Sequence, residues 1–353
     1  MRKGMDHGSW STDKTMKKYF ITIMLACLLL AGCGHTEAVS TQEAEIVLSE
    51  SESVTDVTDY KGDAEISTES DTVEGYPVFD FDHKTVTLNS GYEMPILGLG
   101  MFSLSDDQAE NSTYWALKYG FRLIDTARIY GNEEAVGRGL QRAIDEGIVS
   151  RDEVFITTKM WTSDFDRPDE AIDASLRKLG VDYIDLMILH HSQPRNDVKA
   201  YKAMEEAVKD GRLHSIGLSN YYEPDDFDRL VSETTILPAL LQNETHPYHQ
   251  STEMKEYIAR YGTVLESWFP LGGRGNTQIL FNDETIMKIA NAHDKSSVQV
   301  IIRWHLQAGN ICIPGSSNEQ HIIEDYDVWD FELSEDEMVQ MSALDRNERF
   351  ADY

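Results

Sequence analysis

Short apolar, β-prone runs alternate with longer amphipathic stretches from about residue 84 to the end of the chain. A short apolar run bounded by turn residues indicates a buried strand, whereas apolar positions three and four residues apart indicate a helix. The predicted strands are 96–101, 122–126, 154–160, 183–190, 215–220, 240–245, 263–269 and 311–314. The predicted helices include 107–119, 134–146, 168–179, 198–210, 224–232, 252–261 and 284–307. About eight βα units in regular alternation favour a closed (β/α)8 TIM barrel over an open doubly wound sheet.

A short β-hairpin is predicted in front of the barrel. Residues 84–95 show strand alternation on either side of Asn89-Ser90-Gly91, and this tripeptide is a turn signal. The first barrel strand contains Gly98-Leu99-Gly100 but lacks the third glycine of the dinucleotide-binding fingerprint that open α/β sheets carry. The pattern therefore predicts an α/β domain at residues 78–353, with a hairpin followed by a (β/α)8 barrel.

Residues 1–33 have the pattern of a secretory signal peptide. Lys17 and Lys18 precede an apolar run at 20–31, which is too short for a comfortable membrane span. The run ends in Leu30-Ala31-Gly32-Cys33, which resembles the lipobox of bacterial lipoproteins. That resemblance implies cleavage before Cys33, lipidation of its thiol, and a lipid anchor on the extracytoplasmic side of the cell membrane. The alternatives are an uncleaved anchor, or a cytoplasmic protein if the signal is not processed.

An acidic segment at 34–77 separates the signal peptide from the predicted domain. It is rich in Glu, Asp, Ser and Thr and poor in large apolar residues, a composition typical of a disordered, self-repelling linker. The whole chain has a formal net charge of −31, from 62 acidic and 31 basic residues. We expect no nucleic-acid partner, because such a chain offers no basic surface to phosphates.

Polar side chains with complementary chemistry lie at the ends of successive predicted strands. Asp125 ends one strand and Tyr130 follows it in a loop; Lys159 ends the next strand and His190 the one after. In an α/β barrel these ends converge on the face that carries the active site. A lysine at the end of a buried strand needs a counter-ion, and Asp125 on the neighbouring strand is placed to supply it. An ammonium beside a phenol favours the phenolate, so Tyr130 would release its proton more readily than an ordinary pKa of roughly 10 allows.

Each of these residues also has a structural interpretation when taken alone. Asp125 could be the N-cap or turn residue of the following helix, and Tyr130 could anchor its loop. Lys159 could simply pair with an aspartate, and His190 could be a satisfied core histidine. Their presence together, in the correct order, favours a catalytic group.

Over nearly all of residues 84–350 the sequence resembles the aldo-keto reductase superfamily. The matching motifs are Met94-Pro95-Ile96-Leu97-Gly98-Leu99-Gly100, Asp125-Thr126-Ala127, Tyr130-Gly131-Asn132-Glu133, Thr158-Lys159-Met160-Trp161, Asp185-Leu186-Met187-Ile188-Leu189-His190, Ile216-Gly217-Leu218-Ser219-Asn220 and Phe331-Glu332-Leu333-Ser334. The resemblance implies a catalytic tetrad of Asp125, Tyr130, Lys159 and His190. Tyr130 would be the general acid, and Lys159, supported by Asp125, would lower its pKa. His190 would orient the substrate carbonyl.

The same resemblance implies a nicotinamide cofactor and places its contacts. Carried over by position, the cofactor-binding residues are Ser219, Asn220, Gln242, Trp268, Leu271, Ser316, Ser317, Glu324 and Asp325. Trp268 would stack on the nicotinamide ring, although it could also be a core aromatic. The substrate-binding residues would be Phe102, Trp161 and His190. Many relatives bind the adenosine 2′-phosphate with a lysine and an arginine where this chain has Gly315 and His321, which leaves the choice between NADP(H) and NAD(H) open.

The sequence therefore predicts NAD(P)H-dependent reduction of an aldehyde or ketone to an alcohol, with a small carbonyl compound as substrate. The alternative is a lipid-anchored barrel that binds or senses a nicotinamide or another ligand with little turnover.

No metal site is predicted, because no Cys/His cluster has ligand spacing. His190 and His191 are adjacent and would have opposed side chains if the strand continues, which also argues against a metal site. His191 is assigned to structure. The short tail at 345–353 predicts an open substrate pocket.

Overall fold

The structure is a computed structural model that describes residue 75 and residues 77–351. The predicted signal peptide with Cys33, and all of the predicted linker except Gly75 and Pro77, lie outside the described residues. Those assignments therefore stay predictions. Within the described part of the chain, no helix combines the length and the apolar character needed to cross a membrane.

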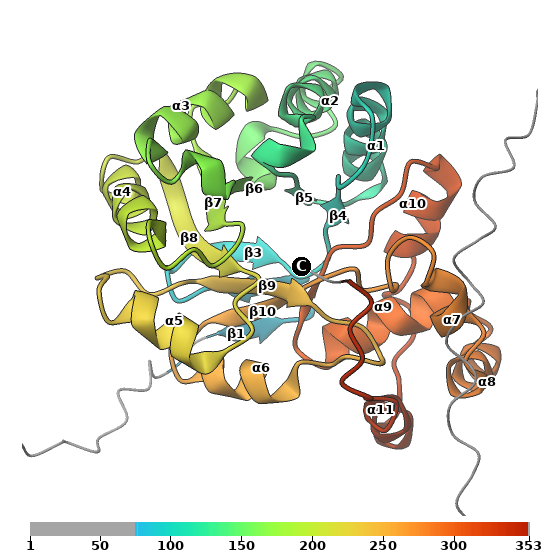
Figure 1. The fold of residues 1–353 in the computed structure, drawn as a ribbon. Coiled ribbons are helices and arrows are strands. Elements are labelled where there is room, and N and C mark those ends of the chain that lie inside the picture. The colour runs from blue at the N-terminus through green and yellow to red at the C-terminus, as the bar shows by residue number, and fades with distance from the viewer. Residues whose placement is uncertain (1–74, 76, 352–353) are drawn as a thin grey trace, which may run out of the picture. The chain divides into compact units, whose positions relative to one another are not determined.

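Parallel strands arranged in sequence order form the barrel in Figure 1. The eight strands are β4 (Leu99–Gly100), β5 (Leu123–Asp125), β6 (Phe155–Met160), β7 (Ile184–Leu189), β8 (Leu213–Ser219), β9 (Leu240–Glu244), β10 (Val264–Trp268) and β11 (Ile311–Cys312). The two edges of the sheet are joined, since Gly98 N donates to the Cys312 carbonyl (2.9 Å) and Cys312 N donates to the Ile96 carbonyl (3.0 Å). The predicted (β/α)8 barrel is confirmed.

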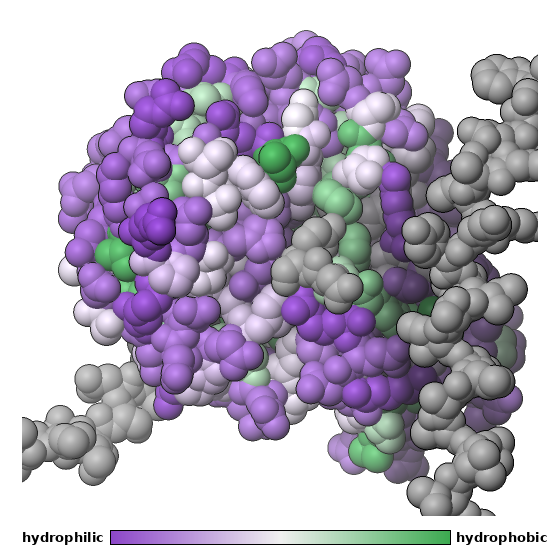
Figure 2. All heavy atoms as spheres, in the orientation of Figure 1, coloured by the Kyte–Doolittle hydropathy of each residue, from purple (hydrophilic) through white to green (hydrophobic). Residues whose placement is uncertain are grey.

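Amphipathic helices surround these strands (Figure 1). They are α1 (Asp106–Tyr119), α2 (Glu133–Asp145), α3 (Pro168–Leu179), α4 (Asp197–Lys209), α5 (Pro224–Val231), α6 (Thr252–Ala259), α7 (Thr277–Phe281), α8 (Glu284–His293), α9 (Ser297–Gln307), α10 (Glu319–Tyr326) and α11 (Glu335–Ser342). Their boundaries follow the sequence: α3 begins at Pro168, which has no N–H to lose, and ends before Gly180 at φ 68°. Figure 2 shows that the visible outer surface over these helices is mainly hydrophilic.

A small antiparallel sheet precedes the barrel. Its strands are β1 (Val78–Asp80), β2 (Thr85–Thr87) and β3 (Glu93–Pro95). β2 and β3 are the predicted hairpin, whereas β1 was not predicted. Val86 and Met94 are fully buried, and Asn89 Nδ2 donates to the Pro238 carbonyl (3.0 Å) just before β9. The sheet therefore packs at the N-terminal ends of barrel strands and leaves the C-terminal ends for a site.

The prediction of one helix at 284–307 is wrong, because the chain forms α8 and α9 there. Asp294 adopts a left-handed conformation (φ 53°) that ends α8. Ser296 and Gln299 then form a capping box, in which Ser296 N donates to Gln299 Oε1 (3.0 Å). This S-x-x-Q start signal was present in the sequence, but the apolar periodicity continued through it. The short helices α7, α10 and α11 were also absent from the predicted helices.

Candidate active site

A cavity of about 780 Å³ opens at the C-terminal ends of the barrel strands. The predicted site residues that line it are Phe102, Asp125, Tyr130, Trp161, His190, Ser219, Asn220, Gln242, Trp268, Leu271, Ser316 and Ser317. Lys159 lies beneath them with no exposed surface. Glu324 and Asp325 are not among the described residues that line the cavity. The fold thus brings most of the predicted residues to one site.

The ion pair between Lys159 and Asp125 is buried beneath this cavity. Lys159 Nζ donates to Asp125 Oδ1 (2.5 Å) and to the Thr126 carbonyl (2.8 Å). The same Nζ lies 4.9 Å from the centre of the Tyr130 ring. Burial opposes a charge on Lys159, but the negative charges of Asp125 and of the ionised Tyr130 phenol outweigh it, so the pKa of Lys159 is raised. The lysine therefore remains an ammonium beside the phenol.

Tyr130 ends a short 3-10 helix (Arg128–Tyr130) that follows β5, and Gly131 ends that turn at φ 76°, a conformation that favours glycine. The Tyr130 ring meets the Phe102 ring (centroids 5.1 Å apart) and the His190 ring (5.7 Å) in edge contacts. The N-cap position of α2 belongs to Asn132. Asp125 is therefore not a helix cap, and that alternative is wrong.

His190 and His191 stack in parallel, with ring centroids 5.3 Å apart and planes inclined by 9°. β7 ends at Leu189, so the alternation of a continuing strand does not apply to these two residues. The condition under which their side chains would point to opposite faces is therefore not met, and both line the cavity. The Trp161 ring lies nearly perpendicular to both histidine rings, with centroids 5.0 Å from His190 and 5.2 Å from His191.

His190 is a neutral imidazole in this position. It is 8% exposed, and burial, followed by the positive charge of Lys159, lowers its pKa to about 2. Its Nδ1 has no hydrogen-bond partner among the described residues. A neutral imidazole can donate a hydrogen bond to an oxygen in the cavity without adding a second positive charge near Lys159.

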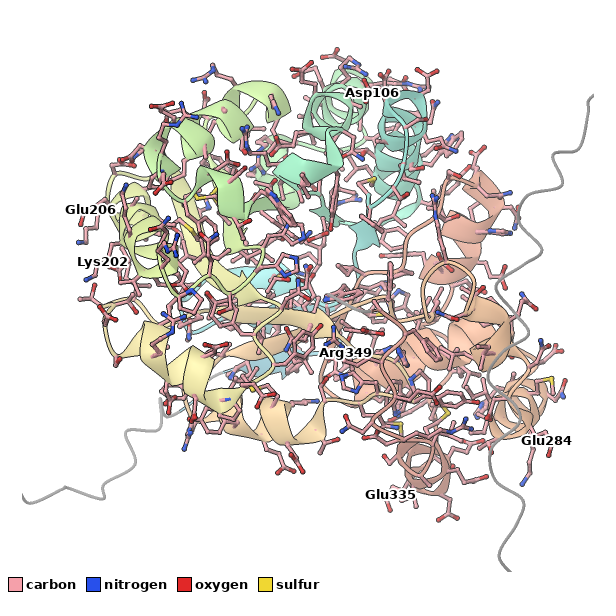
Figure 3. All side chains as sticks on the ribbon, in the orientation of Figure 1. Asp106, Lys202, Glu206, Glu284, Glu335 and Arg349 are labelled. Atoms are coloured by element: carbon pink, nitrogen blue, oxygen red, sulfur yellow. The ribbon has the colours of Figure 1, made fainter. Side chains whose placement is uncertain are left out.

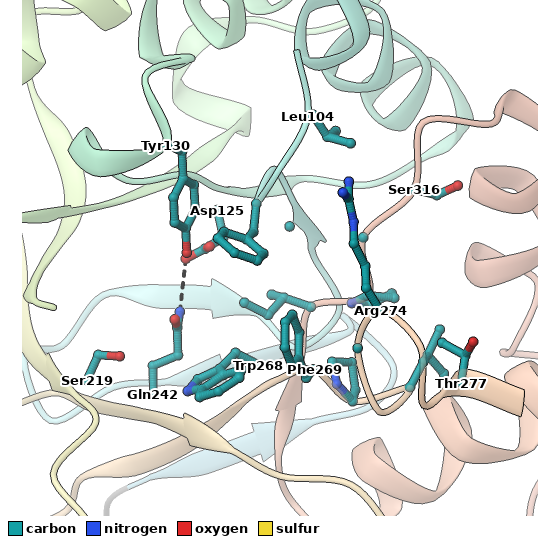
Figure 4. Close-up of a pocket in the computed structure, with 18 of the residues that line it drawn as sticks. Leu104, Asp125, Tyr130, Ser219, Gln242, Trp268, Phe269, Arg274, Thr277 and Ser316 are labelled. Carbon is teal, nitrogen blue, oxygen red and sulfur yellow. Dashed lines mark hydrogen bonds between the residues drawn. The ribbon is translucent and has the colours of Figure 1, made fainter. Parts of the chain in front are cut away.

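Gln242, on β9, donates from its side-chain nitrogen to two carboxyl groups. Nε2 lies 2.9 Å from Asp125 Oδ2 and 2.8 Å from Glu266 Oε2. Figure 4 shows the bond to Asp125 as a dashed line, with Tyr130 also pointing toward this amide. An amide nitrogen carries two hydrogens, so both are used and the carbonyl oxygen remains to accept from a ligand.

Ser219, Asn220 and Trp268 complete this side of the cavity. Asn220, in a left-handed conformation (φ 60°), donates to Ser219 Oγ (3.0 Å) and to the His190 carbonyl (2.9 Å). Trp268 ends β10 and presents a flat aromatic surface close to Gln242 (Figure 4). An amide acceptor beside an aromatic plane suits a flat ring that bears a carboxamide, so the residues present fit a nicotinamide.

The other end of the cavity is formed by the loop between β11 and α10. Ser316 and Ser317 line it as predicted, and His321 lies in the first turn of α10. Glu324 and Asp325 lie farther along α10. Asp325 is 4% exposed, and burial raises its pKa to about 8. Contact of these two acids with a cofactor stays a prediction.

Apart from Leu271, the cavity-lining residues of the loop at 269–276 were not predicted from the sequence. Arg274 in this loop lines the cavity, and its Nη2 donates to the Ser103 carbonyl (2.8 Å) in the loop after β4. Gly272, Gly273 and Gly275 all have positive φ angles, from 69° to 90°. This glycine-rich run was the available signal for a loop that needs unusual backbone conformations.

The described part of the C-terminal tail is held at the end of β9. Arg349 Nε donates to Glu244 Oε2 (3.2 Å), and Phe350 N donates to Glu244 Oε1 (2.5 Å). Figure 3 shows Arg349 near the middle of the barrel view, whereas the labelled Lys202 and Glu206 lie at the periphery. None of the tail residues in the described part of the chain lines the cavity, and the open substrate pocket stays a prediction.

Comparison with known proteins gives the relationship directly. The Aldo/keto reductase family model matches residues 96–346. Methylglyoxal reductase DkgA of Escherichia coli (strain K12) is 40% identical over 268 residues, which cover 75% of this chain and 94% of that protein. An aldo-keto reductase of Mycolicibacterium smegmatis is 41% identical over 268 residues, with coverage of 75% and 94%.

Solved structures agree with the sequence relatives. The Bombyx mori aldo-keto reductase in complex with NADP matches with a TM-score of 0.71 and 33% identity, covering 76% of this chain and 94% of that one. The resemblance drawn from the motifs is confirmed, together with the predicted use of NADP(H) or NAD(H). This chain belongs to the aldo/keto reductase family and is an NAD(P)-dependent oxidoreductase.

Proposed function

We propose that the chain reduces small aldehydes and ketones at the cavity, with Tyr130 as the proton donor. One observation carries this assignment. The buried Lys159 ammonium lies 4.9 Å from the centre of the Tyr130 ring and is paired with Asp125. The neutral His190 ring lies 5.7 Å from the Tyr130 ring, centroid to centroid. A phenol in this setting can give up a proton, because the ammonium stabilises the phenolate that remains.

NAD(P)H, when bound, supplies the hydride that reaches the carbonyl carbon. As the carbonyl double bond is lost, Tyr130 transfers its hydroxyl proton to the carbonyl oxygen and becomes a phenolate. Lys159 stabilises that phenolate, and Asp125 keeps the lysine charged and in place. His190 donates a hydrogen bond to the same oxygen and thereby orients the carbonyl. The alcohol product takes one hydride and one proton, so charge is conserved.

The substrate is proposed to be a small carbonyl compound with an apolar or sugar-like body. Phe102, which is 43% exposed, and Trp161 form an aromatic wall beside Tyr130 and His190. The relative from E. coli is named a methylglyoxal reductase, so methylglyoxal is the first compound to assay. A panel of larger aldehydes and ketones then measures how much the open cavity tolerates.

Tyr130→Phe tests the proton-transfer role. We expect kcat/KM for methylglyoxal with NADPH or NADH to fall by about 10²- to 10⁴-fold, because the proton donor is lost. The dissociation constant of the cofactor should stay within about twofold, since no hydrogen bond to the cofactor is assigned to this hydroxyl. Activity of Tyr130→Phe equal to wild type would contradict the proposal. Tight cofactor binding by wild type without turnover of any carbonyl would favour the sensing barrel instead.

We also propose that the mature protein is anchored through lipid on Cys33. The support is the sequence Leu30-Ala31-Gly32-Cys33 after an apolar run. Incorporation of a labelled fatty acid into wild type, lost in Cys33→Ala, is the expected result. Equal labelling of both chains, or none of wild type, would refute the anchor and leave the reductase assignment unaffected.

A further inference from the structure

Glu266 is an acidic residue inside the barrel that the proposed chemistry does not use. It lies on β10, has no exposed surface, and is not among the described residues that line the cavity. In the sheet register it pairs with Gln242 on β9 and with Ile311 on β11. None of the ion pairs formed by the described residues includes Glu266. Burying a carboxyl without a paired cation costs free energy, so we looked for a role that would account for Glu266.

The hydrogen bond that Glu266 accepts from Gln242 points to such a role. Glu266 Oε2 accepts from Gln242 Nε2 (2.8 Å), and Asp125 Oδ2 accepts from the same nitrogen (2.9 Å). Asp125 in turn accepts from Lys159 through its other oxygen (2.5 Å). Lysine, aspartate, glutamine and glutamate from β6, β5, β9 and β10 therefore form one continuous row below the cavity.

Two acceptors fix an amide more completely than one. With Asp125 alone, the Gln242 carboxamide could rotate about a single hydrogen bond. With Glu266 on the other hydrogen, the plane of the amide is set and its nitrogen is held inward. The carbonyl oxygen of Gln242 is then the atom that the cavity-facing side chain can offer to a ligand.

We propose that Glu266 is a positioning residue that holds Gln242 as a hydrogen-bond acceptor, so that the site selects a ring substituent that carries an N–H donor. This inference rests on the proposed placement of the nicotinamide against Gln242. A carboxamide satisfies the selection, whereas a ketone of the same size presents an oxygen to another oxygen and lacks the donor.

The protonation of Glu266 is compatible with this role. Burial, followed by the negative charge of Asp125, raises its pKa to about 8, while the hydrogen bond from Gln242 and the charge of Lys159 oppose the shift. Cys312 on the neighbouring strand is close enough for the Glu266 charge to help raise the pKa of its thiol. A neutral carboxylic acid still accepts a hydrogen bond through its carbonyl oxygen, and it avoids a second anion beside Asp125.

The test compares Glu266→Gln with Glu266→Met by calorimetric binding. Glutamine keeps a carbonyl acceptor at the same distance, whereas methionine has similar length and no comparable acceptor. The ligands are NADP⁺ or NAD⁺, whichever wild type binds more tightly, and its 3-acetylpyridine analogue, which replaces the carboxamide with a methyl ketone. The measured quantity is the ratio of the two dissociation constants, which general loss of packing would not change.

We expect wild type to bind the carboxamide dinucleotide about tenfold more tightly than the analogue, and Glu266→Gln to keep that ratio. In Glu266→Met the ratio should fall to about twofold, because Gln242 can turn its nitrogen toward the ketone. Cys312→Ala, a packing change beside Glu266, is the matched control and should keep the wild-type ratio. If Glu266→Met does not fold, Glu266→Leu makes the same comparison.

A wild-type ratio in folded Glu266→Met or Glu266→Leu would overturn the inference, as would a wild type that does not discriminate between the ligands. These results are separate from the proposed function. If wild type reduces carbonyls and Tyr130→Phe does not, but the ratio is unchanged in the Glu266 variants, only the positioning role fails. If the ratio changes as expected while Tyr130→Phe remains active, the proton-transfer role fails and the positioning role remains.

Discussion

The two ends of the cavity are built in different ways. At one end of the cavity, called the strand end, Lys159, Asp125 and Gln242 come from barrel strands. They are almost fully buried and joined by direct hydrogen bonds. At the other end, called the loop end, Ser316 comes from a loop and His321 from the first turn of α10. Ser316 there bonds only locally, accepting from Asn318 N (3.1 Å).

The charges differ as much as the packing. A buried ammonium sits under the strand end, whereas Arg274 is the only lysine or arginine among the described residues that line the cavity, and it is already bonded to the Ser103 carbonyl. On the proposed mechanism, the strand end would hold the groups that perform the chemistry. The loop end would be free to vary the affinity for different dinucleotides. Substitutions at the two ends should accordingly give different kinds of effect.

The largest effect is expected from Lys159→Met, which breaks the strand end. Asp125 would keep a buried charge without its counter-ion, so the free energy of unfolding should fall by about 3–5 kcal/mol. Activity should fall by about 10²- to 10⁴-fold. Urea denaturation and steady-state kinetics measure the two effects. The double variant Lys159→Met/Asp125→Asn should recover stability but not activity, and recovery of both would show that the ammonium is not needed for catalysis.

The strand end was also the part that the sequence could predict. A buried strand is a continuous apolar run, so the charged residue at which it stops, such as Lys159 or Asp125, marks the rim of the barrel. The role of Glu266 could not be predicted in this way, because it looks like any polar position in a strand. The role of Glu266 depends on its contact with Gln242. Gln242 also bonds Asp125, which lies 117 positions away in the chain.

The loop end could be predicted less well, because loops do not carry a period. The glycines at 272, 273 and 275 indicate a loop with positive φ angles, but they do not indicate where that loop lies in the fold. The contact of Arg274 with Ser103 therefore could not be inferred from the sequence. The presence of Gly315, where many relatives have a lysine, can be explained only from the three-dimensional structure. A Cβ there would lie 3.0 Å from the Gly100 carbonyl, where the first and last strands of the barrel meet.

A pH dependence of stability should come from Glu266 at the strand end. Its pKa is about 8 in the folded chain against an ordinary value of 4.5, so between these values the folded state holds a proton that the unfolded state has released. The contribution of Glu266 to the free energy of unfolding is therefore fully present below pH 4.5 and is lost as the pH rises toward 8. The slope approaches about 1.4 kcal/mol per pH unit for one proton.

Glu266→Gln removes this titration. Between pH 5 and about 8, the free energy of unfolding should therefore fall less in Glu266→Gln than in wild type, and the two decreases should differ by a few kcal/mol. Asp125, Lys159 and Cys312 face the same space and remain in both chains. Urea denaturation at a series of pH values gives the comparison. Parallel curves for the two chains would mean that Glu266 titrates normally in the fold.

His321→Arg sharpens the loop end by adding a cation at the predicted position of the adenosine 2′-phosphate. Since His321 is exposed and lines the cavity, the longer side chain has room. Charge-assisted hydrogen bonds to the phosphate should shift the ratio of NADH to NADPH dissociation constants by about tenfold in favour of NADPH. His321→Gln is the neutral control. An unchanged ratio in His321→Arg would place the 2′-phosphate elsewhere.

Arg274→Ala should give the smallest effect, because it removes a single exposed hydrogen bond that joins two loops. Loosening the loop at 269–276 should raise the dissociation constant of the cofactor by about threefold and leave kcat nearly unchanged, since none of the strand-end groups moves. Ser103→Ala is a matched control: it alters the partner residue but keeps the backbone carbonyl that accepts the bond, and should bind the cofactor as wild type does. A loss of kcat in Arg274→Ala comparable to that of Lys159→Met would show that the loop places the reacting groups, and the division between the two ends would then be wrong.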